Sequence, residues 1–412
     1  MITMHRDAFP IPAEIPLIVL HPNFSNQHVL LSTALNQPDR IPIFLTLQEP
    51  GTDLNTTWGL LTKALFEQLE VTLPRLEAKP TPDKAAQTLL NTLKQYDRFT
   101  LIIDAFDLAN DSVNGWVGAL AKSLPTGSQI IIAGRQLPLS LMQNKSVQNR
   151  IQLFPLDPER MLLDYTHQPT DRALLEVYGL GLGQALINGK RIDRWDGVLP
   201  RSLFFFFVDR GMVTRDEIFQ TFWPSLSIRE ATNVFHVTKR KISEILDFDL
   251  TVYWSGFYRI SPEIDLHYDV VKFAEHVQNS AVADEASATE LLKQAIDLYQ
   301  GVFLSTLEMN WAASRRHELD LTYAEALSGL GRLRQRQGKV QEALGLYLRA
   351  SATQPHREDL ARGIMSLFCD LGQTDRALEV YERLADELKA TLGVAPDRRT
   401  VELADQIRAT AK

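Results

Sequence analysis

Apolar positions between residues 228 and 246 recur at helical spacing. Ala231, Phe235, Ile242 and Ile245 fall on one face of a helix, and Thr238 completes that face. The opposite face is polar and partly basic. Its side chains belong to Arg229, Asn233, His236, Arg240 and Lys241. The pattern predicts an amphipathic helix with a packed back and a polar front, of a size that the major groove of DNA accepts.

The flanks of this segment predict further elements of one domain. An almost wholly apolar helix is expected over residues 199–209, and a second over 214–223, where Thr214 and Glu217 have capping-box spacing. Residues 250–260 alternate apolar and polar side chains around Gly256, as a β-hairpin does. Strand-like runs with a turn at Asn188-Gly189 come before the helices. Together these elements predict a winged helix-turn-helix over residues 173–277.

The last third of the chain, residues 285–412, has helical periodicity and an internal repeat. The stretch Gly338–Tyr347 recurs as Gly372–Tyr381, with glycine, alanine, leucine and tyrosine at the 34-residue period of tetratricopeptide repeats. Such repeats stack and present a concave face to a partner. We expect the winged helix to fold without them. We also expect Trp311 to pack between helices, and Arg315 and Arg316 to be solvated or paired with acids.

The first third, residues 1–165, has the pattern of an α/β domain. Short apolar runs alternate with helix-like stretches, which indicates a parallel sheet that is buried on both faces. The strand candidates are residues 15–20, 41–46, 100–103 and 129–132. The expected fold is therefore multidomain: an α/β domain, a winged helix and an all-α repeat domain.

Composition and charge restrict the function. The 412 residues are 45% hydrophobic and 23% charged, with a net charge of −8, which argues against a nonspecific DNA-coating protein. Residues 173–277 hold twelve Lys or Arg against fourteen Asp or Glu, so nonspecific DNA affinity should be modest. The lone cysteine, Cys369, excludes an intramolecular disulfide. The sequence shows neither a membrane span nor a signal-peptide core, so we expect a cytoplasmic protein.

Residues 173–277 resemble the OmpR/PhoB-type winged-helix domain. The landmarks are Asn188-Gly189-Lys190, Phe222-Trp223-Pro224, the helix over 228–246 and Gly256–Ile260. The resemblance implies that the polar helix face, the hairpin Tyr253–Tyr258 and Arg259 approach DNA. The DNA-binding residues expected on this basis are Arg229, Asn233, His236, Lys239, Arg240, Lys241, Tyr253 and Arg259. This chain departs from the pattern at Ser243 and Glu244, where basic residues are frequent.

Residues 291–408 resemble the bacterial transcriptional activator domain of the SARP (antibiotic regulatory) proteins. The residues that carry the resemblance include Tyr299–Leu304, Trp311, Arg315, the repeat above and Leu392–Pro396. With the winged helix, the resemblance covers about 230 residues in the family's domain order. It implies a transcriptional regulator that contacts RNA polymerase or another regulatory protein. A homodimer is a further arrangement that the sequence leaves open.

Residues 1–165 resemble the nucleotide-binding domain of signal-transducing (STAND) P-loop ATPases of the MalT type. Asp104, after the apolar run 100–103, takes the place of the magnesium-linked acid. The loop after the first strand departs from the family, because it has no glycine, Gln27 stands near the lysine position and His28 near the hydroxyl position. Gln27, His28 and Asp104 are therefore interpreted as vestigial. We expect no ATP turnover and no bound cofactor.

Two alternative interpretations stay open beside this one. One is a metal or hydrolase site formed by His21, His28, Asp104 and Asp107. Acids at strand ends, however, commonly persist as caps or ion-pair partners. A non-catalytic sensor or docking domain without a metal site is therefore the better interpretation. The order of the three domains, with the ATPase-like part first, differs from that of large SARP regulators. The function that the sequence favours is that of a sequence-specific regulator of promoter DNA, most simply an activator. The rival function is a protein-interaction scaffold whose winged helix has lost DNA binding.

Overall fold

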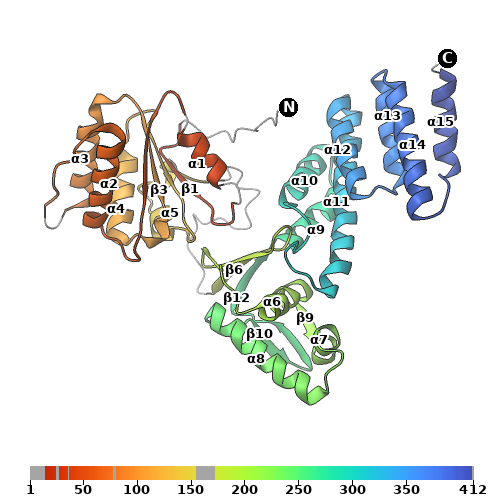
Figure 1. The fold of residues 1–412 in the computed structure, drawn as a ribbon, viewed down its shortest axis with the longest axis horizontal. Helices are drawn as coiled ribbons and strands as arrows, with labels where there is room; N and C mark the ends of the chain where they lie inside the picture. Colours follow the sequence, from red (N-terminus) through yellow and green to blue (C-terminus); the bar gives the residue numbers. More distant parts are fainter. Residues whose placement is uncertain (1–13, 25–26, 36, 78–79, 155–171, 411–412) are drawn as a thin grey trace. The chain divides into compact units, whose positions relative to one another are not determined.

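The computed structural model describes residues 14–24, 27–35, 37–77, 80–154 and 172–410 (Figure 1). The chain forms two compact units. Unit 1 comprises Met1–Glu176, Gln184–Arg194 and Pro262–His267. Unit 2 comprises Val177–Gly183, Trp195–Ser261 and Tyr268–Lys412.

Unit 1 contains a parallel five-stranded sheet, as the sequence predicts. Its order is β2-β3-β4-β1-β5, and neighbouring strands in it are parallel. The strands are β1 (Leu17–Leu20), β2 (Ile41–Thr46), β3 (Phe99–Asp104), β4 (Gln129–Ile132) and β5 (Ile151–Phe154). All four residues of β1 are buried, because helices cover both faces of the sheet. The sequence did not identify β5 as a strand.

The two faces of the sheet carry separate cores. On one face, Leu17 and Val19 of β1 pack with side chains of α2, α3 and α4. On the other face, Ile18 and Leu20 pack with side chains of α1. The helices are α1 (Gln27–Leu35), α2 (Leu54–Leu69), α3 (Pro82–Thr92), α4 (Asp111–Ser123) and the short α5 (Leu139–Met142). This arrangement brings the end of β1 and the start of α1 to the point where the strand order reverses.

A second sheet of unit 1 has the order β12-β6-β7-β8. Its strands are β6 (Ala173–Tyr178), β7 (Gln184–Ile187), β8 (Lys190–Arg191) and β12 (Ile264–Tyr268). The predicted turn at Asn188-Gly189 is confirmed, and both residues have positive φ. Gly189 accepts a hydrogen bond from Leu137 N at 3.1 Å, and a Cβ atom at Gly189 would lie only 3.2 Å from Leu137 Cβ. This hairpin therefore packs with the α/β part, rather than with the helices that follow it in sequence.

Unit 2 begins with the three predicted helices and the hairpin. The elements are α6 (Val198–Arg210), β9 (Met212–Thr214), α7 (Arg215–Phe222), α8 (Ile228–Leu246), β10 (Thr251–Trp254) and β11 (Phe257–Ile260). The strands form an antiparallel sheet of order β10-β11-β9. Helix α6 is buried along nearly its whole length, and its four consecutive phenylalanines are each at most 2% exposed. Helix α8 packs against α6.

The remaining helices of unit 2 stack as antiparallel pairs, which confirms the predicted repeat architecture (Figure 1). They are α9 (Asp269–Ser280), α10 (Glu285–Leu298), α11 (Asn310–Arg336), α12 (Val340–Thr353), α13 (Glu358–Asp370), α14 (Thr374–Thr391) and α15 (Arg398–Thr410). Ala343 and Ala377 are fully buried at equivalent places in α12 and α14. Tyr347 fills the space beside Gly363, where an added Cβ would lie 2.7 Å from the tyrosine ring. Small residues thus allow neighbouring helices to approach closely.

The start of α11 packs against α6. Trp311 is 8% exposed and lies edge-on to Phe206 with the ring centroids 5.3 Å apart. Arg315 pairs with the buried Asp209 at 3.2 Å. Arg316 donates to backbone carbonyls of the loop before α11. The expected packing of Trp311 and the expected acid partner of Arg315 are confirmed. The independent folding of the winged helix stays a prediction, and these contacts count against it because α11 packs against α6.

Candidate nucleic-acid interface

Helix α8 starts at a capping box. Ser227 Oγ accepts from Glu230 N, and the Glu230 carboxylate accepts from Ser227 N at 3.1 Å. These hydrogen bonds hold the pKa of Glu230 below its usual value, with the Ser227 hydroxyl as the main cause. The cap satisfies backbone donors at the helix start and fixes where the first turn begins.

The apolar stripe of α8 lies against the core as predicted, with one change. Ala231, Phe235, Thr238 and Ile242 are buried. Ile245 is only half-buried, and Leu246 is buried in its place. The stripe holds the rotation of α8 about its axis, and so decides which side chains face solvent.

The solvent face of α8 carries a row of polar side chains. Arg229, Asn233, His236 and Arg240 follow one another at four- and three-residue spacing, and all four are exposed. Val237 lies beside this row and is 49% exposed. An apolar side chain here is suited to the C5-methyl group of thymine. Our sequence reasoning missed Val237, although its helical position next to Asn233 and Arg240 was a usable signal.

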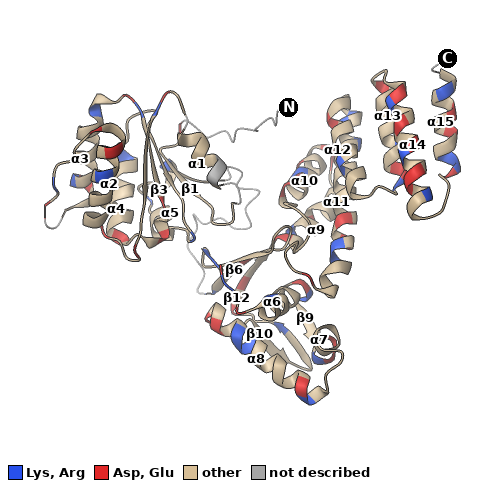
Figure 2. Ribbon diagram, in the orientation of Figure 1, with Lys and Arg blue, Asp and Glu red and all other residues tan. Residues whose placement is uncertain are grey.

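Three cations of α8 already have carboxylate partners. Arg240 pairs with Glu244 at 3.3 Å on the exposed face. On either side of the row, Lys239 pairs with Asp249 at 3.6 Å and Lys241 with Asp196 at 2.6 Å. Figure 2 shows blue and red residues alternating along α8. Exposed ion pairs contribute little free energy. Because carboxylates already compensate these cations, phosphates that take their place bring only a small net gain in binding free energy.

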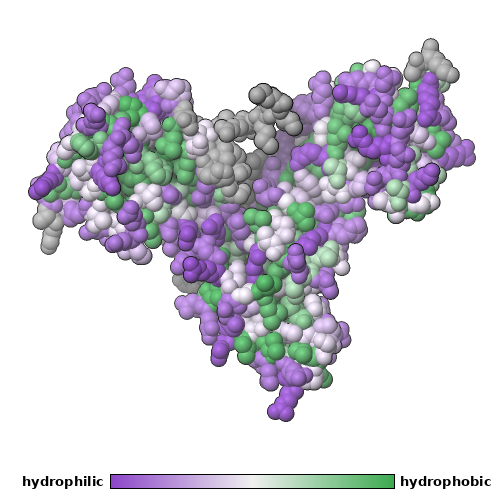
Figure 3. All heavy atoms as spheres, in the orientation of Figure 1, coloured by the Kyte–Doolittle hydropathy of each residue, from purple (hydrophilic) through white to green (hydrophobic). Residues whose placement is uncertain are grey.

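The hairpin β10–β11 places two aromatic side chains in solvent. Tyr253 is 65% exposed and Trp254 is 57% exposed. The Arg259 guanidinium lies over the Trp254 ring, 5.2 Å from its centroid, so it is held at the hairpin rather than extended. Tyr258 anchors the hairpin to the core, with its ring 5.0 Å from that of Phe235, and burial raises its pKa. Figure 3 shows hydrophobic surface over this part of unit 2.

Polar groups of the loop between β1 and α1 form hydrogen bonds with one another. Gln27 Nε2 donates to the His21 carbonyl at 3.0 Å, and Phe24 N donates to the same oxygen at 2.9 Å. Asn23 N donates to His21 Nδ1 at 3.1 Å. Burial lowers the pKa of His21 to about 3, so the imidazole is neutral at pH 7. In the described part of this loop, the backbone donors Asn23 N and Phe24 N are thus engaged within the loop itself.

The strand-end acids of unit 1 serve as local caps. Asp104 Oδ1 accepts from Ala105 N at 2.8 Å, and Asp107 Oδ1 accepts from Arg135 N at 2.9 Å. Among the residues that the structure describes, no group of three His, Cys, Asp or Glu side chains is arranged to hold a metal ion. The side chain of His28 lies outside the described residues. The three described members of the alternative set, His21, Asp104 and Asp107, are not brought together as a metal site.

Comparisons with known proteins find a family match in the helical part of the chain and one similar curated protein. Residues 268–408 match the family described as "Bacterial transcriptional activator domain". The regulatory protein AfsR of Streptomyces griseus is 26% identical over 197 residues, which are 47% of this chain and 20% of that relative. The match therefore covers only a fifth of the relative's length. The chain therefore contains a segment similar to bacterial transcriptional activator domains and is similar to one part of AfsR.

Solved structures are similar to this chain at lower sequence identity. EmbR of Mycobacterium tuberculosis, solved in complex with a low affinity phosphopeptide, is 18% identical over 58% of this chain and 66% of EmbR, with a TM-score of 0.49. A STAND protein with a tetratricopeptide repeat sensor from Pyrococcus horikoshii is 9% identical, and covers 96% of this chain and 65% of that protein, with a TM-score of 0.20. Neither score supports an argument about function. In the described part of the chain, no helix has the length and apolar character of a membrane span.

Proposed function

We propose that the protein is a sequence-specific regulator that binds double-stranded promoter DNA through a winged helix formed by α6–α8 and the β10–β11 hairpin. The observation that carries the proposal is the exposed row Arg229, Asn233, His236 and Arg240 on a helix whose opposite face is locked to the core. A helix of this kind enters the major groove with its outer face toward the base edges.

The side chains of the row differ in what they can read. Arg240 matches the two acceptors of guanine, and Asn233 matches the acceptor and donor of adenine. Val237 adds a surface for thymine methyl groups. Lys239 and Lys241, one residue to either side of Arg240, are placed for phosphates rather than bases. The hairpin residues Tyr253 and Arg259 would contact the neighbouring groove or backbone, with Trp254 as a further contact.

Activation would use surfaces outside the base-reading row. The loop between α7 and α8 exposes Leu226 and, at the first position of α8, Ile228, which is 71% exposed. Exposed apolar side chains of this kind are suited to contact a protein. Together with the helical part of unit 2, this loop would bind RNA polymerase or another regulatory protein. The α/β part of unit 1 would serve as a non-catalytic sensor or docking domain, and the proposal assigns no catalytic residue.

One observation favours the rival function, a scaffold without DNA binding. The ion pairs of Lys239, Arg240 and Lys241 reduce the charge that α8 offers to phosphates. A DNA-binding protein with such pairs would depend more on base contacts and less on counterion release. The two functions therefore predict different results for DNA binding itself.

Footprinting the full chain on the DNA upstream of its own gene would locate an operator, and gel-shift titration would then measure affinity. Asn233→Ala and Arg240→Ala should each weaken operator binding by about 1–3 kcal/mol, because each removes a base contact. Arg398→Ala on α15 is the matched control and should leave binding unchanged. A protected site that neither substitution weakens, or no protected site at all, would favour the scaffold.

A further inference from the structure

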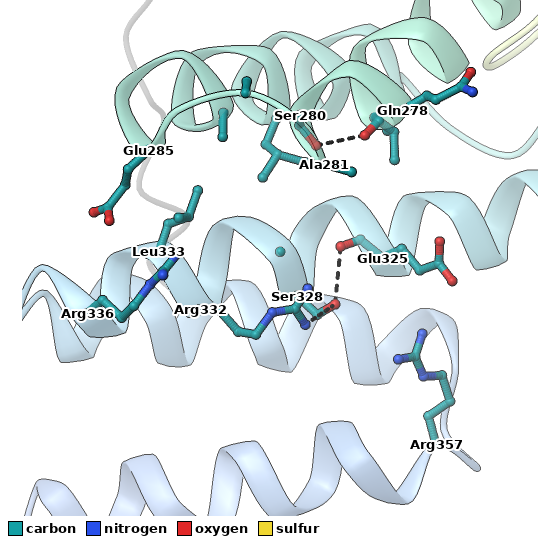
Figure 4. A pocket seen from close by; sticks show the side chains of 15 residues that line it. Gln278, Ser280, Ala281, Glu285, Glu325, Ser328, Arg332, Leu333, Arg336 and Arg357 are labelled. Carbon is teal, nitrogen blue, oxygen red and sulfur yellow. Dashed lines mark hydrogen bonds between the residues drawn. The ribbon is translucent and has the colours of Figure 1, made fainter.

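A cavity of about 690 Å³ lies between α9, α10 and α11, wholly within unit 2 (Figure 4). The charged side chains that line it belong to Glu285, Glu325, Arg332, Arg336 and Arg357. Arg357 is already paired with a carboxylate of α13, so the remaining charges balance. The lining therefore favours neither an acidic nor a basic partner. The segment that leads into α6 differs, because its charged side chains have defined partners at both of its ends.

One end of this segment, the turn and second strand of the β7–β8 hairpin, is docked on the α/β part of unit 1. Leu137 N donates to Gly189 O at 3.1 Å. Arg191 N donates to Arg135 O at 2.9 Å, and the Arg191 guanidinium donates to the Pro22 carbonyl at 3.1 Å. These hydrogen bonds fix the hairpin on the residues after β4 and on the loop after β1.

Asp193 adds ion pairs to the same docking contact. Its carboxylate lies 2.8 Å from Arg191 Nε and 3.5 Å from Arg135 Nη1. One carboxylate thus joins an arginine of the hairpin to an arginine that follows β4. The side chain of Asp193 is 31% exposed, so solvent screens this cluster only in part.

The other end of the segment lies on α6 and α8, within unit 2. The ring of Trp195 packs 4.8 Å from that of Phe204, a buried residue of α6. Asp196 pairs with Lys241 of α8, with Oδ2 2.6 Å from Nζ. A carboxylate thus stands beside a cation that the proposed function assigns to phosphate.

Five residue steps separate Arg191 from Asp196, so the two ends are not independent. A fully extended chain covers about 3.3–3.6 Å per residue, which limits this link to about 18 Å. A short tether keeps its end at a high effective concentration near a partner. Docking of Arg191 on the loop after β1 therefore favours the pair between Asp196 and Lys241.

We propose that residues 189–196 form an autoinhibitory strap. When the strap is docked on the α/β part, it holds Asp196 against Lys241 and lowers the affinity of α8 for DNA. The carboxylate compensates the lysine and repels a phosphate at the same place. Release of the Arg191 end frees Lys241 for the DNA backbone. This inference rests on the proposed function and adds the route by which the α/β part acts on the DNA reader.

The test is a double-mutant cycle on the full chain, measured by gel-shift titration with the operator. Asp196→Asn should strengthen binding about threefold and steepen a plot of log affinity against log salt by about 0.9, because one further phosphate is bound. Arg191→Gln should also strengthen binding, by a smaller factor, although it removes a positive charge. The double variant should bind no more tightly than Asp196→Asn alone, because the strap acts through Asp196.

A second readout tests the strap without DNA. Acetic anhydride labels free amino groups, and mass spectrometry of the digested chain gives the rate for each lysine. Lys241 should react faster in Asp196→Asn and in Arg191→Gln than in the wild type, because its amino group loses its partner. Lys239 pairs with Asp249 outside the strap, so it should keep its rate and serves as the internal control.

Arg98→Gln is the matched control for both measurements, because it breaks an exposed ion pair with Asp39 at the opposite end of the parallel sheet. Asp193→Asn loosens the docked end in a second way and should act like Arg191→Gln. An unchanged labelling rate of Lys241 in both of these strap variants, with the chains folded by circular dichroism, would overturn the inference. Independent gains in affinity that multiply in the double variant would do the same. If no operator is found, the proposed function fails and the effect on DNA falls with it, whereas labelling still decides whether the strap couples its two ends.

Discussion

The indole nitrogen of Trp311 donates a hydrogen bond to Ser202 Oγ over 3.0 Å. Trp311 is at the start of α11, and Ser202 is a fully buried residue of α6. A second link lies nearby, where Arg315 and Tyr268 both donate to Asp209 Oδ1. The helix bearing the candidate DNA-reading row packs on α6, and α6 packs on α11. Packed side chains of α6 therefore connect the helix that bears this row with the start of the repeat helices.

The Trp311 contact predicts a graded loss of stability. Trp311→Ala should lower the free energy of unfolding by about 3–5 kcal/mol, because it removes a large buried side chain. Trp311→Phe keeps most of the packing and should cost about 1 kcal/mol for the lost hydrogen bond, with further loss from the smaller ring. Urea unfolding measures both. Trp254→Ala, at an exposed tryptophan, is the control and should stay within about 0.5 kcal/mol.

The contacts of Trp311 and Arg315 with α6 also predict how a truncated chain that lacks α11 should behave. A fragment of residues 1–280 lacks Trp311 and Arg315, so Asp209, whose side chain is 3% exposed, would lose its cationic partner. Removal of α11 also exposes the face of Phe206 on which Trp311 packs, and exposing a large apolar side chain costs about 1.5–3 kcal/mol. We therefore expect the fragment to lose operator affinity and activation together. A folded fragment by circular dichroism that keeps full operator affinity would show that α11 is dispensable.

Glu244 should limit the affinity of α8 for DNA. Its carboxylate pairs with Arg240 at 3.3 Å and would repel phosphates at the same face. Glu244→Gln frees Arg240 and should strengthen operator binding several-fold, with a plot of log affinity against log salt steeper by about 0.9. Gel-shift titrations at three salt concentrations measure both quantities. Glu379→Gln on α14 is the control, and an unchanged slope in Glu244→Gln would place Arg240 away from the DNA.

The hydrogen bonds within the loop after β1 predict that the protein does not bind nucleotide. Gln27 closes the loop onto the His21 carbonyl, and Phe24 N donates to the same oxygen, so two donors are already engaged. Mg-ATP should give no thermal shift and no turnover, whereas a ligand at one hundred times its Kd would add about 2.7 kcal/mol of stability. Differential scanning fluorimetry provides the measurement. A rise in melting temperature that Asp104→Asn abolishes would show a working site.

Sequence patterns predicted the helices and strands of this chain better than they predicted which residues contact one another in the fold. The 34-residue repeat and the stripe from Ala231 to Ile242 are local signals, because helical periodicity is set by residues three and four apart. The partner of Arg240, Glu244, is also a local signal, because it is four residues away. The partner of Lys241 is different: Asp196 is 45 residues from it, and periodicity contains no information about such pairs. For the same reason the contact of Trp311 with Ser202, 109 residues away, was outside the reach of sequence reasoning.

Asp269 should make stability depend on pH. Its carboxylate is buried at the start of α9 and accepts from Gly179 N at 2.7 Å and from Leu180 N at 2.9 Å. Burial raises the pKa of Asp269 to about 7 although these hydrogen bonds favour the charged form. The carboxyl is therefore protonated in the folded protein between about pH 4 and 7, where the unfolded chain has already released the proton. Folding then takes up a proton in that range.

The sign of the effect follows from proton linkage. A group with a raised pKa in the folded state contributes stability that is complete below its unfolded pKa, near 3.8, and is lost as pH rises to about 7. The loss amounts to roughly 4 kcal/mol over that interval at about 1.36 kcal/mol per pKa unit. Asp269→Asn removes this titration, so the stability of wild type relative to the variant should fall from pH 4 to pH 7 and then level off. Urea unfolding at pH 4, 5.5, 7 and 8 measures the difference. If wild type instead gained stability relative to Asp269→Asn as pH rises, the two backbone donors would outweigh burial and Asp269 would be a charged anchor for the segment 179–180.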